Sequence, residues 1–115
     1  MIYDRAHDLA RALKASPEYQ AFLKAKEALA PDGEAKKMVR DFLLKKAELE
    51  YEAMTGKSED KAKIEQLQRM YELIAYNSKA REFMEAHTRF QRIMADVSKI
   101  IGEAVAEGLD IFAKD

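Results

Sequence analysis

The chain of 115 residues contains no cysteine, only two prolines and only four glycines. Without cysteine it can form no disulfide, no thiolate metal site, no cysteine-ligated iron–sulfur cluster and no cysteine nucleophile. So few glycines and prolines exclude turn-rich sandwiches and barrels and glycine-rich phosphate loops. Twenty basic and 21 acidic residues leave a net charge of -1, which gives no overall attraction to nucleic acid or anionic membrane.

Long apolar runs are absent as well. Asp4 and Arg5 bring charge within five residues of the start, and no apolar core of a signal peptide follows. Charged residues interrupt the apolar stretches well before the about 18–20 residues that a membrane span needs. With no cysteine and no signal, we expect a cytoplasmic protein without a membrane partner.

The residues that are present favour helices. Hydrophobic residues make up 48% and charged residues 36% of the chain, which is the balance of a globular protein. Good helix formers dominate, and no stretch alternates with a period of two. The sequence predicts an all-α fold in a single helical domain over residues 1–115. We expect an elongated bundle of about five helices, with long antiparallel helices that self-associate.

Capping residues divide the predicted helices. Ser16, followed by proline, and Asp32 are candidate N-caps, and Gly56 is a candidate residue just past a helix end. Ser58 is interpreted as the cap of the fourth helix, and the chain breaks or kinks at Asn77. These signals predict helices over about residues 2–15, 17–30, 33–55, 59–76 and 78–108.

The last predicted helix has apolar residues at alternating spacings of four and three, as in a coiled coil. We call the following residues the heptad stripe and identify them as a candidate interface: Phe83, His87, Phe90, Met94, Val97 and Ile101. A helix of about 30 residues is about 45 Å long, whereas a compact domain of this size has a radius of gyration near about 13 Å. The helices over 33–55 and 78–108 are therefore expected to extend beyond a compact monomer, so their apolar stripes need a second copy or a helical partner.

Basic residues gather on the third predicted helix. Lys36, Lys37 and Arg40 form a candidate weak anion patch, because Lys36 and Arg40 share a helical face that phosphate groups could contact. Acidic residues on the same helix favour a second interpretation, a solvated face with ion pairs one turn apart.

The two histidines are the other candidates for chemistry. His7 follows Asp4 at the spacing found in di-iron bundles, but such a site needs a second copy of the motif, and there is none. His87 is interpreted as a core or interface histidine, with a pH-sensitive contact as the alternative. No serine lies in a nucleophile elbow. We therefore predict no catalytic, cofactor-binding or metal-binding residue.

Several segments resemble the YlbF/YmcA-like proteins of Gram-positive bacteria over about residues 2–105. They are the run AHDLARALKASPEY from Ala6 to Tyr19, the segment from Ala25 to Ala35, the run REFMEA from Arg81 to Ala86, and the apolar residues from Ile93 to Ile101. The resemblance implies a small all-helical cytoplasmic protein that self-associates and acts as a non-catalytic regulator. Characterised relatives join a hetero-complex that acts on competence, sporulation and biofilm formation through ribonuclease Y.

Those complex-forming relatives bind iron–sulfur clusters through cysteine, which this chain lacks. It therefore resembles the cysteine-free YheA-like branch more closely, and no cofactor is expected. The expected partners are a second copy of the chain, related helical proteins or a ribonuclease complex, and not nucleic acid. Two alternatives remain open: an all-α enzyme of the chorismate mutase type, and a weak RNA-binding module that uses the basic face of the third helix.

Overall fold

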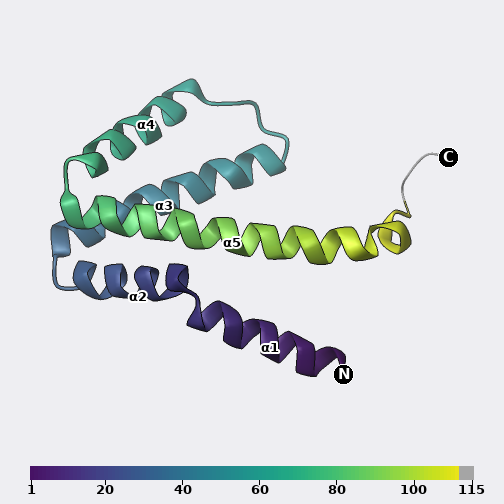
Figure 1. Cartoon of the computed structure of the whole chain (residues 1–115). Helices are drawn as coiled ribbons and strands as arrows, with labels where there is room; N and C mark the ends of the chain where they lie inside the picture. The colour runs from purple at the N-terminus through teal and green to yellow at the C-terminus, as the bar shows by residue number, and fades with distance from the viewer. Residues whose placement is uncertain (112–115) are drawn as a thin grey trace.

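The computed structural model describes residues 1–111, which fold into five α-helices and contain no strand (Figure 1). The all-α fold predicted from the sequence is confirmed. The first helix has the predicted bounds, and the last ends one residue later than predicted. The helices are α1 (Ile2–Ala15), α2 (Pro17–Leu29), α3 (Gly33–Met54), α4 (Lys61–Ala75) and α5 (Ser78–Leu109).

Side chains cap the N-termini of three of the helices, as expected from the sequence. The side-chain oxygens of Ser16, Asp32 and Asn77 accept a hydrogen bond from the backbone N–H three residues later, at 3.2, 3.0 and 3.0 Å. Each bond satisfies a donor that the helix itself leaves unpaired. Gly56 has a φ of 82°, which is the left-handed conformation expected after a helix end. The chain therefore breaks fully at Asn77 and starts a new helix there.

The predicted cap of α4 is wrong. Asp60, not Ser58, accepts hydrogen bonds from the backbone N–H groups of Ala62 and Lys63, at 3.0 and 3.3 Å. A carboxylate caps a helix as well as a hydroxyl does, so the local sequence allows both starts. The later start places Lys63 one turn inside α4, where its ammonium lies 2.7 Å from the carboxylate of Glu52 on α3.

Removing the Asp60 cap is expected to destabilise the fold more than removing the Ser58 side chain does. Asp60→Ala should lower the free energy of unfolding by about 1 kcal/mol, because two backbone N–H groups lose their acceptor. Ser58→Ala changes an exposed residue outside the helix and should stay within about 0.5 kcal/mol of the parent protein. Urea unfolding measures both values. An equal loss in the two variants would contradict the assigned cap.

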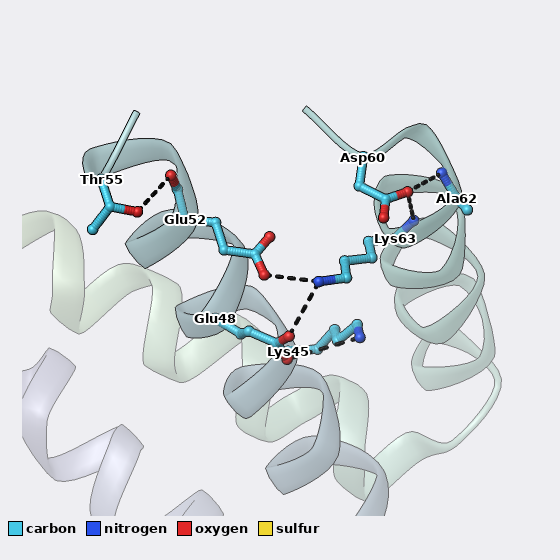
Figure 2. A network of polar contacts seen from close by, with 7 residues as sticks. All are labelled: Lys45, Glu48, Glu52, Thr55, Asp60, Ala62 and Lys63. Atoms are coloured by element: carbon cyan, nitrogen blue, oxygen red, sulfur yellow. Dashed lines mark hydrogen bonds and ion pairs between the residues drawn. The ribbon is translucent and has the colours of Figure 1, made fainter. Parts of the chain in front are cut away.

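Ion pairs hold the far ends of α3 and α4 together (Figure 2). The ammonium of Lys63 lies between the carboxylates of Glu52 and Glu48, at 2.7 and 3.4 Å, and Glu48 also lies 3.8 Å from Lys45. The hydrogen bond from Lys63 lowers the pKa of Glu52 and raises the pKa of Lys63. Lys63 and Glu52 are half-buried and Glu48 is exposed, so the pairs keep contact with water and fix the pairing of the two helices more than they stabilise the fold.

The apolar stripe of α3 is covered by its neighbours in the chain. Ala35, Val39 and Phe42 are buried, and the ring of Phe42 packs on Tyr71 of α4 at a centroid distance of 5.7 Å. The prediction that this helix has an uncovered stripe is therefore wrong, because α4 folds back along it (Figure 1).

The core lies where α2, α3, the end of α4 and the start of α5 meet. The ring of Phe22 on α2 packs on Phe83 and Phe90 of α5, at 5.3 and 5.8 Å, and Tyr19 packs on Phe90 at 5.1 Å. The buried cluster consists of Leu29, Ala35, Val39, Phe42, Ile74, Ala80, Phe83 and Met84. These contacts join α2 to the first half of α5 only.

Two elements therefore project from the core. Figure 1 shows α1 and the second half of α5 running away from it in the same general direction. The chain is flat and extended, with dimensions of 48 × 40 × 15 Å and a radius of gyration of 18.0 Å. A compact domain of this length would have a radius of gyration of about 13 Å.

Candidate interaction surface

Helix α1 presents an apolar face that the rest of the chain does not cover. Within the described part of the chain α1 packs against α2 alone, and none of its residues is buried. Ile2 is 81% exposed and Leu9 is 37% exposed, on the face that also holds Ala6 and Ala10. An amphipathic helix in water normally buries such a face, so α1 lacks a partner within this chain.

The heptad stripe changes from buried to exposed along α5. Phe83 is 8% exposed and belongs to the core, and His87, Phe90 and Val97 are half-buried. Met94 and Ile101 are exposed, at 37% and 54%. The structure thus divides the candidate interface: α2 already covers its first half, and the second half is open.

The open surface of α5 continues past the predicted stripe. Val105 and Leu109 are exposed and follow Ile101 toward the end of the helix, and Ile100, just before it, is exposed as well. Sequence reasoning left Val105 and Leu109 out of the candidate interface, although apolar residues at helical spacing beyond Ile101 were a usable signal. We call α1 together with five exposed residues of α5 the open face; they are Met94, Ile100, Ile101, Val105 and Leu109.

The surface area of the chain supports this description. Its accessible surface is 9468 Å². A compact monomer of this mass exposes about 6,400 Å², so about 3,000 Å² is in excess. Obligate interfaces bury about 2,000–5,000 Å² in total, shared between two partners. The extended chain therefore exposes additional surface comparable in area to an obligate interface, and the open face is part of that surface.

The candidate anion patch does not form one cluster. The ammonium of Lys37 lies 3.0 Å from the carboxylate of Asp41, as expected for a solvated face. Lys36 and Arg40 instead line a groove of about 480 Å³ between α2 and α3, together with Lys26. We call this the α2–α3 groove; leucines line it as well, among them Leu23, Leu43 and Leu44.

Three arginines line a second hollow, between the end of α4 and α5. This cleft of about 470 Å³ contains Arg81, Arg89 and Arg92, and Glu85 lies beside them. Arg81 donates a hydrogen bond to the backbone carbonyl of Ala75 at 3.0 Å, and so links α5 to the end of α4. The charge of Glu85 therefore offsets part of the positive charge of the cleft, and Arg81 has a structural role there.

Among the described residues, neither histidine belongs to a group of side chains that could bind a metal ion. His7 is exposed on α1, and residues 1–111 contain no group of three potential ligands that could hold a metal ion. The ring of His87 packs on Phe22 and Phe83, at centroid distances of 5.6 and 6.0 Å. Burial lowers the pKa of His87 below its ordinary value of 6.5, and the charge of Lys46 lowers it further.

This environment predicts a pH dependence of stability. Because the folded chain favours the neutral ring, the unfolded chain binds more protons once the pH falls below about 6.5. The contribution of His87 is therefore complete above that pH and is lost as the pH falls toward the folded pKa. Urea unfolding at pH 7.5 and 5.5 should show a smaller loss in His87→Phe than in the parent protein. Equal losses would contradict this assignment.

No helix within residues 1–111 is both long enough and apolar enough to span a membrane.

The fold and the open face define a class: small all-helical proteins with a large unpaired apolar surface. Within that class, the chain belongs to the family described as control of competence regulator ComK, YlbF/YmcA, whose model matches residues 2–106. The family resemblance seen in the sequence is confirmed, and the relatives below are consistent with the cysteine-free YheA-like branch.

The curated relatives are proteins of the UPF0342 group. The chain is 39% identical to one from Desulfitobacterium hafniense over 99% of this chain and 92% of the relative. It is 39% identical to one from Symbiobacterium thermophilum, over 90% and 93%, and 35% identical to one from Streptococcus pneumoniae, over 92% and 95%.

Two solved structures share the fold. A protein of unknown function (DUF964) from Bacillus stearothermophilus matches with a TM-score of 0.77 and 24% identity, over 97% of this chain and 98% of that one. Bacillus subtilis RicA, solved in complex with RicF, matches with a TM-score of 0.57 and 24% identity, over 95% and 96%.

Proposed function

We propose that this protein is a non-catalytic regulatory or scaffold protein of the cytoplasm that acts by self-association and by binding related helical proteins. The observation that supports this most strongly is the open face of α1 and α5. Its apolar residues remain exposed in the single chain, and the chain as a whole exposes about 3,000 Å² more surface than a compact monomer of its mass.

The character of the interior supports the absence of catalysis. Among residues 1–111 the buried side chains are all apolar, and no polar or charged residue is buried. An enzyme of the chorismate mutase type needs charged groups held inside the helices to bind a dianionic substrate. The basic residues of this chain instead lie on its surface, where they suit contacts with a partner.

The relatives support a regulatory role. The family is described by its control of the competence regulator ComK, and the structural neighbour RicA was solved bound to RicF. We propose by analogy that a second copy or another family member binds the open face of this chain. A link to ribonuclease-dependent control of development, competence or biofilm formation rests on the family resemblance alone.

Site-specific photo-crosslinking in the native cell tests the proposal. The crosslinker benzoylphenylalanine is placed at Leu9 or at Ile101, both on the open face. The control position is Ala95, an exposed residue on a polar side of α5, one turn from Arg92 and Lys99. The first two positions should give adducts of defined mass that contain this chain or a family member, and Ala95 should give none. No adduct at Leu9 and Ile101, or equal adducts at all three positions, would overturn the proposal.

A further inference from the structure

The end of α5 is an acidic amphipathic helix. From Ile100 to Ile111, which covers the last turns of α5 and the two residues after its end, the chain contains three acidic residues, Glu103, Glu107 and Asp110, and no basic one. We call this segment the α5 tip. All of its residues are exposed, among them Ile100, Ile101, Val105 and Leu109. The tip therefore presents both an apolar stripe and negative charge that the single chain leaves open.

The charge of the tip follows one edge of its apolar stripe. Glu103 and Glu107 are one helical turn apart, and Ile100 lies on the same side of the helix as Glu107 and Glu103. The only ion pair of the tip within the described residues joins Glu103 to Lys99, at 3.9 Å between exposed groups. A partner surface complementary to the tip would be apolar, with two cations one turn apart along its edge.

The α2–α3 groove has this pattern. Lys36 and Arg40 are one turn apart on α3, and Lys26 lines the groove from α2. Leu23 and Leu43 are among its apolar lining residues, and no acidic side chain lines it. Within residues 1–111 neither Lys26, Lys36 nor Arg40 forms an ion pair.

We propose that the α2–α3 groove binds the α5 tip of a second copy of this chain. The apolar stripe of the tip then packs on the leucines of the groove, and Glu103 and Glu107 face Lys36 and Arg40. The two pairs match in spacing, because residues four apart on a helix are separated by about one pitch of 5.4 Å. This inference rests on the proposed self-association and specifies its contact.

The tip of the same copy cannot reach the groove. Phe83, near the start of α5, lines the groove, and Glu103 lies twenty residues further along the same straight helix, about 30 Å away. Two α5 helices that lie antiparallel would instead bring each tip beside the start of the other α5. This arrangement is reciprocal, so both grooves are filled and the assembly closes as a pair.

The arginine cleft between α4 and α5 is a less complementary site for the tip. Glu85 lies among its lining residues and would repel the acidic tip. Arg81 already donates to the carbonyl of Ala75, so one of its three cations is engaged. The cleft therefore provides a control site at which the same change of charge can be made.

Complementary charge reversal tests the proposal on the full chain. The groove variant is Lys36→Glu with Arg40→Glu, the tip variant is Glu103→Lys with Glu107→Lys, and the control is Arg89→Glu with Arg92→Glu. At low salt, each of the first two variants alone should self-associate at least about tenfold more weakly, because like charges then face each other. Mixing them restores opposite charges at both contacts, so hetero-pairs should form with near-parental affinity.

Native mass spectrometry distinguishes the outcomes, with circular dichroism to show that each variant is helical. Hetero-pairs between the groove and tip variants, without hetero-pairs between the control and tip variants, support the contact. Unchanged self-association of both variants, or equal weakening of the control, overturns the contact and leaves the proposed self-association standing. A parental protein that remains monomeric overturns both.

Discussion

Replacing Ile101 by aspartate is expected to raise the dissociation constant of self-association by at least about a hundredfold while the chain stays folded. Ile101 is 54% exposed in the single chain, so its fold does not depend on this side chain. In an assembly the same position is covered, and a buried carboxylate without a partner costs about 3 kcal/mol or more, which is about a hundredfold in affinity. Sedimentation velocity measures the association, and circular dichroism measures the helix content.

A matched variant separates the open face from a general effect of charge. Ala95→Asp introduces the same charge six residues earlier, on a polar side of α5 one turn from Arg92 and Lys99, where the parent residue is exposed. This variant should associate as the parent protein does. If Ile101→Asp also associates normally, the open face is not the contact surface.

The largest expected loss of stability follows from Phe83→Ala. Phe83 is 8% exposed, and its ring packs on Phe22 and His87 at 5.3 and 6.0 Å. Removing a buried aromatic ring typically costs about 3–5 kcal/mol, because the contacts between α2 and α5 are lost and a cavity remains. That is a large part of the total stability of a small domain, about 5–15 kcal/mol.

Met94 provides the comparison along the same stripe. It is 37% exposed in the single chain, so Met94→Ala should cost less than about 1 kcal/mol in the monomer. Urea unfolding is measured at low protein concentration, because association would add to the apparent stability. Similar losses of unfolding free energy in Phe83→Ala and Met94→Ala would contradict the finding that the stripe is buried at Phe83 and exposed at Met94.

The boundaries of the helices were predictable because their causes are local. Ser16, Asp32 and Asn77 each bond to a backbone N–H three residues away, and such a bond depends on little else. The start of α4 was not predictable in this way. Ser58 and Asp60 are both adequate caps, and the start at Asp60 coincides with the ion pair between Lys63 and Glu52, 11 residues apart in the chain.

The burial of the heptad stripe could be predicted only in part from the sequence. Its spacing correctly indicated one apolar face on α5, but a periodic pattern does not say which part of that face another helix covers. The cover depends on α2, which has 13 residues against the 32 of α5. The exposed half of the stripe follows from this difference in length. The isolation of α1, which packs against α2 alone, was not anticipated from the sequence.

The candidate anion patch could also be predicted only in part, because the groove that it lines is formed by two helices. Lys36 and Arg40 share a face of α3, which the sequence indicated, whereas Lys26 reaches the same groove from another helix. The joint placement of these three cations depends on how α2 packs against α3. Lys37 is adjacent in sequence to Lys36 but points to Asp41, because neighbouring residues lie on different sides of a helix.

The central claim is that a second copy of this chain covers the open face of α1 and α5. Sedimentation equilibrium of the purified full chain, from about 0.1 to 100 µM, tests it most directly, because obligate interfaces of this size are mostly occupied well below that upper limit. We expect a mass of at least two chains of 13.2 kDa each, and we expect Ile101→Asp to weaken this association. A mass of one chain over the whole range would contradict it.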